Sequence, residues 1–363
     1  MERWGKGVLS FLLSLFLPPR RRNYPQREQI QKVLVFRLDQ RVGNGVMLVP
    51  LLRAIKKSLP RGELHLLINA PVALLLQQTL PGTVDRIWPY EQHRLLRAPW
   101  LLMGLLFRLR RERYDVIISC HNPDSFSLSQ ALWGILCRPR WLIGPDWGNS
   151  PRFYNAAVSV SNQVHYTRAM VDLWKVVDRT ARVELGGLQV PRETRLAVRK
   201  RYAHLPLDGI LLWLGATGRK AIPPDLLTYL YEQIVAHTSR PVLLACGPAD
   251  REGVAKYPAW IGERTVVWNR PLVETAAFFS QFRCFISGDT GPAHLAVALG
   301  LPTLTLFIQS NARQYGYHDG VRHFVVERQK DAKTRMELNR ALRELLTRDF
   351  AECGFSSRKI IPD

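Results

Sequence analysis

The residues of this chain best suited to chemistry lie at 287–294, which read Ser-Gly-Asp-Thr-Gly-Pro-Ala-His. Residues 284–286 have the composition of a buried strand, and the spacing at 293–299 predicts a helix. A strand, a glycine turn and a helix N-terminus leave backbone N–H groups without intrahelical partners, and such groups bind phosphate. His294 would add a donor or a positive charge. Alternatively, Asp289 or Thr290 serves only as the helix N-cap.

This segment, continued by Leu-Gly-Leu-Pro at 299–302, resembles the nucleotide-sugar motif of family 9 glycosyltransferases, the lipopolysaccharide heptosyltransferases. The family pattern is roughly D-[ST]-G-x-x-H-x-A-x-A-L-G-x-P. Residues 33–39, Gly43 and residues 50–56 are similar to the family's opening strand, glycine loop and first helix. Weaker matches follow the family's order within 31–330: Tyr114-Asp115-Val116-Ile117-Ile118, His165, Val171-Asp172-Leu173, Lys220 with Pro223, Cys246-Gly247-Pro248 and Leu272-Val273-Glu274.

The resemblance implies an α/β fold of the GT-B type, with two Rossmann-like domains facing across a cleft and a C-terminal helix that can return to the first domain. The alternation of short aliphatic runs and amphipathic stretches independently predicts mostly parallel sheets. Gly186, Gly187 and Pro191 interrupt the pattern at a domain boundary. The expected parts are a basic amphipathic segment at 1–30, an acceptor-side domain at 31–185, a nucleotide-sugar-binding domain at 186–330, and a helix with a basic tail at 331–363.

Individual elements follow from the same pattern. Expected strands are 33–37, 63–68, 116–119, 141–144, 210–214, 242–245, 265–268, 284–287 and 303–307, and expected helices are 46–59, 125–137, 224–237 and 336–348. Ligands of such sheets bind at the carboxyl ends of the strands.

The activity implied is an inverting, metal-independent transfer of heptose or a related sugar from an ADP-heptose-like donor to a lipopolysaccharide core or another lipid-linked acceptor. Such transfer requires stabilisation of the departing diphosphate and removal of a proton from the acceptor hydroxyl. The chain contains no Asp-x-Asp, the metal-binding motif of many other transferases. We therefore expect no metal and no cofactor, and stabilisation by amides, a helix dipole and basic side chains.

Candidate donor-binding residues lie in two loops. The first is the Asp289-Thr290-Gly291 turn with His294, and the second, at 215–220, reads Gly-Ala-Thr-Gly-Arg-Lys. The expected ligands to the nucleotide sugar are Thr217, Arg219, Lys220, Glu252, Asp289, Thr290, Gly291 and His294. Lys220 falls where the family places a phosphate-binding lysine, and Glu252 near an acidic residue suited to ribose hydroxyls. A solvated turn and a surface helix are the alternatives for these two residues.

The catalytic base is less plain, because Asn44 stands where the family has an aspartate after Gly43. An amide cannot act as a general base at neutral pH. Asp39 could serve instead, Asn44 could only position the acceptor while another carboxylate or water removes the proton, or the protein is a silent homologue that binds nucleotide or glycolipid as an assembly or regulatory subunit. Asp39, beside Arg37 and Arg41, could also be a structural ion pair.

The acceptor side has fewer signals. His121, Asn122 and Asp124 follow the expected strand at 116–119, and Arg41 lies in the first loop, where each could contact sugar hydroxyls or phosphates. A polar loop without a ligand is the alternative. Gly43-x-Gly45 lacks the third glycine of a dinucleotide loop, since Leu48 stands there, so a nicotinamide enzyme is not expected.

Charge and N-terminal composition indicate a membrane-facing protein. The net charge is +21, yet zinc-finger spacing, aromatic RNA-binding strands and a helix-turn-helix are absent from the sequence. We expect an anionic membrane surface and an anionic lipid-linked glycan as partners, and no nucleic acid. An apolar run at 4–17, followed by Arg20, Arg21 and Arg22, is too short to span a bilayer and favours an in-plane amphipathic helix. Packing of this helix on the protein itself is the alternative.

A second stretch, at 94–113, combines an apolar centre with six arginines. It is either an ordinary domain helix with solvated ends or a further membrane-facing element. The five cysteines show no metal-ligand or disulfide spacing and are expected to be reduced, mostly buried thiols. The expected location is the cytoplasm, peripheral on the cytoplasmic face of the bacterial inner membrane.

Overall fold

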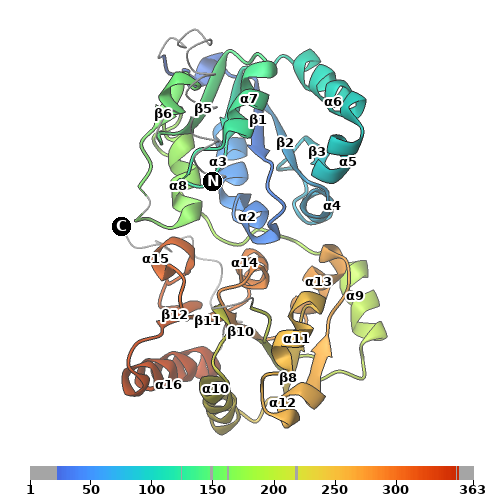
Figure 1. The fold of residues 1–363 in the computed structure, drawn as a ribbon, viewed down its shortest axis with the longest axis vertical. Coiled ribbons are helices and arrows are strands. Elements are labelled where there is room, and N and C mark those ends of the chain that lie inside the picture. The colour runs from blue at the N-terminus through green and yellow to red at the C-terminus, as the bar shows by residue number, and fades with distance from the viewer. Residues whose placement is uncertain are drawn as a thin grey trace. The chain divides into compact units, whose positions relative to one another are not determined.

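A computed structural model describes residues 23–123, 125–147, 150–161, 163–216, 220–348 and 350, without the side chains of Leu95 and Leu96. The expected N-terminal amphipathic helix and the C-terminal tail lie outside the described residues. The chain divides into two compact units (Figure 1). The first contains Met1–Arg41 and Leu48–Glu184, and the second contains Val42–Met47 and Leu185–Asp363. The sequence division assigned 42–47 to the N-terminal domain, whereas its contacts group it with the second unit.

The first unit is built on a six-stranded sheet in the order β3-β2-β1-β4-β5-β6, with every neighbouring pair parallel. The strands are β1 (Lys32–Arg37), β2 (Glu63–Asn69), β3 (Arg86–Tyr90), β4 (Val116–Ser119), β5 (Trp141–Pro145) and β6 (Ala156–Val158). This is the Rossmann order, in which the direction of winding reverses between β1 and β4. That reversal defines the switch point of the first sheet.

Helices cover both faces of this sheet, which explains why its central strands are apolar without alternation. On one face, Leu34 and Phe36 of β1 pack in a core with Leu106 and Leu109. Val33 and Val35, which alternate with them, are equally buried. The helical elements are η1 (Arg27–Gln29), α3 (Val49–Ser58), α4 (Ala70–Thr79), α5 (Gln92–Arg97), α6 (Pro99–Arg111), α7 (Leu128–Leu136), η2 (Ser150–Arg152) and α8 (Tyr166–Trp174).

The second unit repeats the same topology, with a parallel six-stranded sheet in the order β12-β11-β10-β7-β8-β9. Its strands are β7 (Ile210–Trp213), β8 (Val242–Cys246), β9 (Thr265–Val267), β10 (Cys284–Gly288), β11 (Thr303–Phe307) and β12 (His323–Glu327). Here the switch point lies between β7 and β10. The two sheets confirm the expected α/β class with two Rossmann-like units.

The helices of the second unit complete its layers. They are α2 (Val42–Val46), α9 (Arg192–Arg201), α10 (Pro224–His237), η4 (Pro248–Asp250), α11 (Arg251–Val254), α12 (Ala259–Arg264), α13 (Leu272–Phe279), α14 (Gly291–Ala298), α15 (Ala312–Tyr315) and α16 (Asp331–Thr347). The C-terminal helix α16 packs on α10, β11 and β12, burying Leu338, Leu342 and Leu345 in their common core. It is therefore an integral layer of the second unit.

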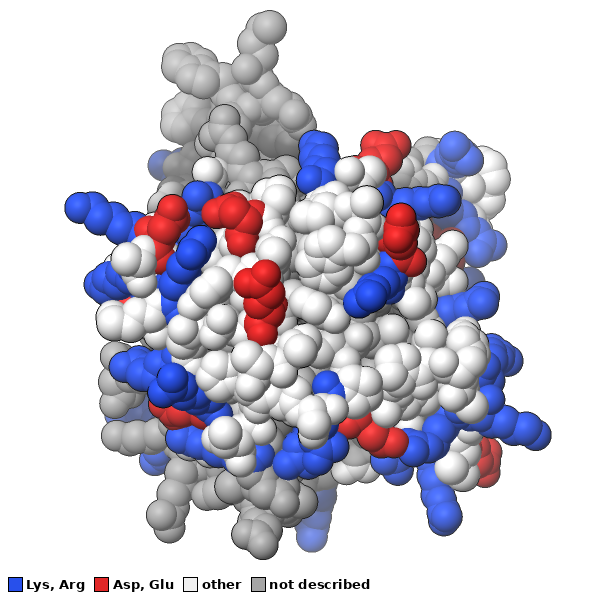
Figure 2. Space-filling model, turned by 90° about the horizontal axis from the view of Figure 1, so that it is seen from below, with Lys and Arg blue, Asp and Glu red and all other residues white. Residues whose placement is uncertain are grey.

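Surface properties bear on the expected partners. Across the described residues, no helix is both long and apolar enough to cross a bilayer. On the face in Figure 2, Lys and Arg side chains lie mainly around the margin, and uncharged residues with a few acidic ones occupy the centre. This face thus has no continuous basic track among its described residues. The cysteines of the described part, Cys120, Cys137, Cys246 and Cys284, are free and buried.

Candidate functional site

The donor-side candidates gather at the switch point of the second sheet. Strands β7 and β10 are paired there, with Trp213 opposite Ser287. The loop that contains Lys220 follows β7, and the turn that begins with Asp289 follows β10. Crossover helices diverge from a switch point, so the loops that follow its two strands leave a crevice suited to a ligand.

Lys220 and Asp289 join these two loops. The Lys220 ammonium donates to a carboxylate oxygen of Asp289 at 2.5 Å. The Asp289 side chain is 5% exposed, and that of Lys220 is 46% exposed. A buried carboxylate therefore holds the lysine, while half of the lysine side chain remains open to solvent and to an anionic ligand.

The N-terminus of α14 is not closed by its own side chains. Thr290 is the N-cap residue but makes no side-chain capping bond. The buried atoms Thr290 Oγ1 and His294 Nδ1 have no hydrogen-bond partner among the residues that the structure describes. Thr290 therefore occupies the N-cap position without a side-chain capping bond, and the Asp289 carboxylate pairs with Lys220.

His294 is neutral at pH 7. Burial lowers the pKa of His294 to about 4, and nearby Lys220 acts in the same direction, against the opposing effect of Asp289. The ring of Tyr317 packs edge-on against it, with centroids 5.6 Å apart. His294 is therefore a hydrogen-bonding group at neutral pH, and the positive charge considered from the sequence is absent.

Helix α2 packs against α14 at glycine. A Cβ added at Gly43 would lie 2.7 Å from Cδ2 of His294 and 3.1 Å from Cα of Gly291. Asn44, the next residue, is 9% exposed. The glycine loop recognised in the sequence thus supports the helix whose N-terminus faces the expected phosphate, and it places Asn44 beside that contact.

An acidic residue other than the expected one lies at the end of β8. Glu252 is exposed on α11. The Asp250 carboxylate, by contrast, lies 2.5 Å from the position of a Cβ on Gly215 and 3.2 Å from one on Gly247, so it sits over the ends of β7 and β8. Burial raises the pKa of Asp250. The signal available in the sequence was its place two residues after the Gly-Pro at the strand end.

The loop after β11 and the short helix α15 that follows it contribute two further polar groups that the sequence did not suggest. Ser310 Oγ and Gln314 Nε2 are buried and have no hydrogen-bond partner among the described residues. Strand β11 pairs with β10, so this loop follows the strand next to the Asp289 turn. A serine in a short loop and a glutamine in a four-residue helix carry no pattern of their own, which explains why they were missed.

Two expected donor ligands, Thr217 and Arg219, lie outside the described residues. Of the others, Lys220, Asp289, Thr290, Gly291 and His294 are brought together at the switch point.

At the switch point of the first sheet, Arg37 organises the polar residues. Its guanidinium is 2% exposed and donates to the carbonyl oxygen of Cys120 at 2.5 Å and to Asn122 Oδ1 at 2.9 Å. It also hydrogen-bonds to the Tyr166 hydroxyl and forms an ion pair with Asp39. This buried arginine thereby brings the loops after β1 and β4 together.

Asp39 is accessible despite this ion pair. Its side chain is 34% exposed, and its carboxylate accepts a hydrogen bond from the Arg41 backbone N–H at 2.9 Å. The structural ion pair considered from the sequence is present, with Arg37. The exposed fraction also leaves the carboxylate open to an acceptor hydroxyl.

The other acceptor-side candidates differ in accessibility. His121 is 3% exposed, and its Nε2 lies 3.1 Å from the Tyr154 hydroxyl while its Nδ1 lies 3.0 Å from the Asn122 carbonyl oxygen. It faces the core of the first unit and is a poor ligand for a glycan. Arg41 is exposed, and Asp124 lies outside the described residues.

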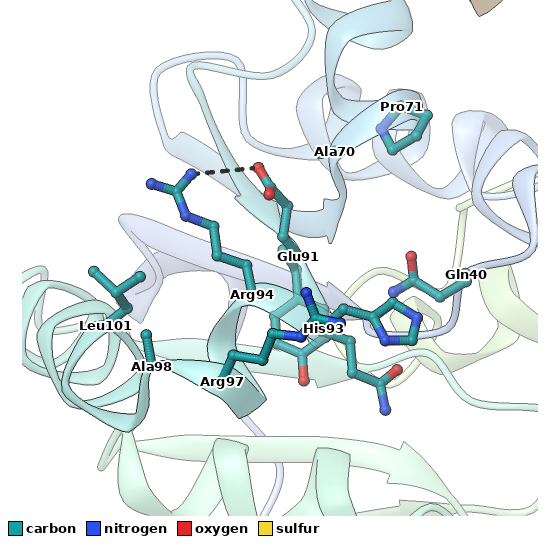
Figure 3. Close-up of a pocket in the computed structure, with 11 residues that line it drawn as sticks. Gln40, Ala70, Pro71, Glu91, His93, Arg94, Arg97, Ala98 and Leu101 are labelled. Carbon is teal, nitrogen blue, oxygen red and sulfur yellow. Dashed lines mark ion pairs between the residues drawn. The ribbon is translucent and has the colours of Figure 1, made fainter.

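A pocket of about 520 Å³ opens at the carboxyl ends of β1, β2 and β3 in the first unit (Figure 3). Gln40 follows β1, Ala70 follows β2, and His93, Arg94 and Arg97 follow β3. The Arg94 guanidinium lies 3.9 Å from the Glu91 carboxylate, an ion pair marked in Figure 3. The sequence had indicated these arginines only as the flank of an apolar stretch.

One acidic cluster has the make-up of a metal site. Ligand atoms of Glu63, His65 and Glu112 lie within 4.8 Å of one another. The Lys32 ammonium, however, contacts the Glu63 carboxylate at 2.8 Å and the Glu112 carboxylate at 3.0 Å. A lysine thus already provides the positive charge that balances these acids.

Comparisons with known proteins agree with this geometry. The model of glycosyltransferase family 9 (heptosyltransferase) matches residues 104–341. No curated protein is similar enough in sequence to be recognised as a relative.

Solved structures share the fold at low sequence identity. A family 9 glycosyl transferase from Veillonella parvula is 15% identical with a TM-score of 0.71, covering 89% of this chain and 98% of that one. The E. coli ADP-heptose lps heptosyltransferase II is 17% identical with a TM-score of 0.63, covering 86% and 98%. The E. coli heptosyltransferase WaaC with ADP is 16% identical with a TM-score of 0.61, covering 85% and 99%. These likenesses confirm the expected GT-B-type fold.

Proposed function

The chain belongs to glycosyltransferase family 9, the heptosyltransferase family, and from that premise we propose that it moves heptose or a related sugar from an ADP-heptose-like donor to a lipopolysaccharide core or another lipid-linked acceptor. Its structural relatives include an ADP-heptose lps heptosyltransferase and a heptosyltransferase in complex with ADP. Both fit the chemistry of the switch point in the second unit.

The observation that carries this proposal is the Lys220–Asp289 pair beside the open N-terminus of α14. In the proposed complex, the Gly291 backbone N–H at the start of α14 and the Lys220 ammonium donate to the pyrophosphate. The buried Thr290 hydroxyl and the neutral His294 ring supply hydrogen bonds for which the described part of the chain offers no partner. Asp250, at the end of β8, accepts from the ribose hydroxyls.

These groups would act on the leaving diphosphate. Negative charge grows on the oxygen that separates from the anomeric carbon, and preorganised donors at that position lower the barrier. We propose that this stabilisation requires no metal and that transfer is a single displacement with inversion of the anomeric configuration. What supports stabilisation without a metal is the set of groups proposed to bind the diphosphate, which consists of a backbone amide, an ammonium and neutral hydrogen-bonding groups.

For proton removal we propose Asp39. It is an accessible carboxylate at the switch point of the first unit, and Arg37 fixes its position. Asn44 has no proton-accepting form of suitable basicity, so its proposed role is to position the acceptor.

We assign the acceptor to the pocket of the first unit. His93, Arg94 and Arg97 supply positive charge or hydrogen bonds at its wall, which suits a glycan bearing phosphates and carboxylates. A lipid-linked acceptor requires the protein to work at a membrane. We therefore propose peripheral association with the cytoplasmic face of the bacterial inner membrane, supported by the net charge of +21.

A second candidate function is a catalytically silent homologue that binds nucleotide or glycolipid as an assembly or regulatory subunit. The specific observation in its favour is Asn44 in place of the family's aspartate, together with the ion pair that neutralises Asp39.

A transfer assay separates the two candidates. The purified full chain is incubated with ADP-heptose and a deacylated lipopolysaccharide core, with and without EDTA, and the product is analysed by mass spectrometry and NMR. The proposal expects a heptose adduct of inverted anomeric configuration that EDTA does not diminish. ADP binding without any transfer or donor hydrolysis would instead establish the silent homologue.

A further inference from the structure

Helix α6 presents an apolar face to solvent. Trp100, Met103 and Phe107 are 70%, 62% and 62% exposed, and their spacing places them on one side of the helix. The opposite side buries Leu106 and Leu109 in the core of the first unit. A helix of a soluble domain ordinarily directs polar side chains outward, so a contiguous exposed apolar face indicates a binding surface.

Arginines surround this face. Arg94, Arg97, Arg108 and Arg111 are exposed, and the Arg111 guanidinium lies 5.8 Å from the centre of the Phe107 ring. The nearby acids are largely engaged: Glu91 pairs with Arg94, and Glu112 binds Lys32 and Arg86. We call these four arginines and the three apolar residues the α6 surface, and its net charge is positive.

We propose that the α6 surface docks on an anionic lipid bilayer. The three apolar side chains would enter the boundary between headgroups and acyl chains, and the arginines would bind lipid phosphates. Helix α6, Pro99–Arg111, is too short to span a membrane and would lie in its plane. Tryptophan favours this interfacial depth, since its ring is apolar and its N–H is polar.

Charge and position favour a bilayer over a second protein. Protein interfaces are depleted of charge at their centre, whereas here arginines border the apolar residues on both sides along the helix. The α6 surface is also continuous with the acceptor pocket, because Arg94 and Arg97 belong to both. Helices α5 and α6 lie together on the β3 side of the first unit (Figure 1).

Because the α6 surface is continuous with the acceptor pocket, its docking on a bilayer would also position that pocket. A docked α6 surface would hold the pocket at headgroup level, where the glycan of a lipid-linked acceptor begins. That last step rests on the proposed function, but docking on the bilayer does not.

Vesicle binding tests the docking. The full chain and the triple variant Trp100→Ser, Met103→Ser, Phe107→Ser are mixed with vesicles of phosphatidylethanolamine and phosphatidylglycerol. The matched control is Leu196→Ser, Val235→Ser, Met336→Ser, whose residues are 55%, 51% and 65% exposed in the second unit. We expect the first triple variant to lose about tenfold or more in partition coefficient, and the control less than about twofold. Equal binding by both would overturn the proposal.

Fluorescence quenching complements this comparison, because it reports whether Trp100 enters the bilayer. Brominated lipids quench a tryptophan that lies in the interface, and the conservative variant Trp100→Phe keeps the apolar face. We expect the quenched fraction of the emission to fall in Trp100→Phe relative to the unsubstituted chain. An unchanged quenched fraction would place Trp100 outside the bilayer and contradict the proposal.

Two substrates separate this inference from the proposed function. The first triple variant should transfer to a deacylated acceptor at the normal rate and lose transfer to the same glycan in vesicles. A chain that binds vesicles through α6 but transfers to neither acceptor would refute only the proposed function. If the triple variant abolished self-association while vesicle binding stayed intact, the occupant would be a second copy and the proposal would be wrong.

Discussion

Lys220 and Asp289 form a 2.5 Å ion pair that ties the loop after β7 to the turn after β10. The two strands are hydrogen-bonded neighbours on either side of the switch point in the second sheet. Since the carboxylate is buried and the lysine is half exposed, the pair orients a cation toward the crevice. It thereby links the fold of this unit to the phosphate chemistry proposed for it.

Removal of this cation should impair transfer. Lys220→Ala is expected to lower kcat/KM for the nucleotide sugar about 100-fold or more, because a donor to the leaving diphosphate is lost. Lys220→Arg should retain much of the activity. The control Lys256→Ala removes an exposed lysine of the same unit and should change kcat/KM by less than about twofold. Steady-state kinetics at varied donor concentration, with a thermal melt of each variant, checks this. Wild-type kcat/KM in a folded Lys220→Ala protein would contradict the role.

Buried histidines should make the protein sensitive to acid. Burial lowers the pKa of both His294 and His323 to about 4 from an ordinary value of 6.5. Between these values the unfolded chain binds more protons than the folded one, so the free energy of unfolding falls as the pH falls from 6.5 toward 4. Each histidine contributes a slope of at most about 1.4 kcal/mol per pH unit, and none above that window.

The variant His294→Gln isolates one of these contributions. Its urea unfolding midpoint, measured from pH 4.5 to 7, should fall less steeply with decreasing pH than that of the unsubstituted chain. Parallel curves for the two proteins would show that His294 has an ordinary pKa in the folded state.

The contact between α2 and α14 should tolerate no side chain at Gly43. Gly43→Ala would place a methyl group 2.7 Å from His294 Cδ2, and we expect a loss of about 1–3 kcal/mol in unfolding free energy together with a raised KM for the donor. In the control Gly262→Ala, nothing lies within 4 Å of the added Cβ, and helix α12 should become slightly more stable. Chemical denaturation and donor kinetics measure both effects. Equal stabilities of the two variants would refute the close approach.

Asp39 and Asn44 can be separated as base and positioning residue. Asp39→Asn should lower kcat about 100-fold or more with little change in the KM for donor, because an amide cannot take the proton. Asn44→Asp should restore part of the activity to Asp39→Asn if a carboxylate there reaches the acceptor. Asp208→Asn, at an exposed ion pair with Arg199, is the control. Full activity in Asp39→Asn would exclude Asp39 as the base.

Central strands were predictable from the sequence, whereas the edge strands were not, except for β9, which was expected at 265–268. The expected strands at 116–119 and 303–307 coincide with β4 and β11, and the helix at 224–237 coincides with α10. The strands β3, β6 and β12 were missed, and each lies at an edge of its sheet. Edge strands are only partly buried, and Pro89 interrupts β3, so their aliphatic pattern is weak.

Helix boundaries were also only partly predictable from the sequence. One helix was expected over 46–59, but the chain forms α2 and α3 with a break at Met47 and Leu48. The apolar residues run through the break, so periodicity does not reveal it. The break separates the segment that packs on α14 from the helix of the first unit.

In the candidate site, residues within local sequence motifs could be predicted from the sequence, whereas pairings between residues far apart in the chain could not. The Asp289 turn and Lys220 could be found because each lies in a recognisable motif of the loop that follows a strand. The pairing of Arg37 with Asn122, 85 positions apart, depends on the strand order. Asp250 and the pocket residues Gln40 and His93 likewise become candidates only when neighbouring strands bring their loops together.

The most direct test of the central claim is a crystal structure of the full chain with ADP. The account predicts both phosphates at the N-terminus of α14, with Lys220 Nζ and the Gly291 amide within hydrogen-bond distance of phosphate oxygens and the Asp250 carboxylate at the ribose. ADP bound at any other strand end, with Lys220 still paired only to Asp289, would contradict it.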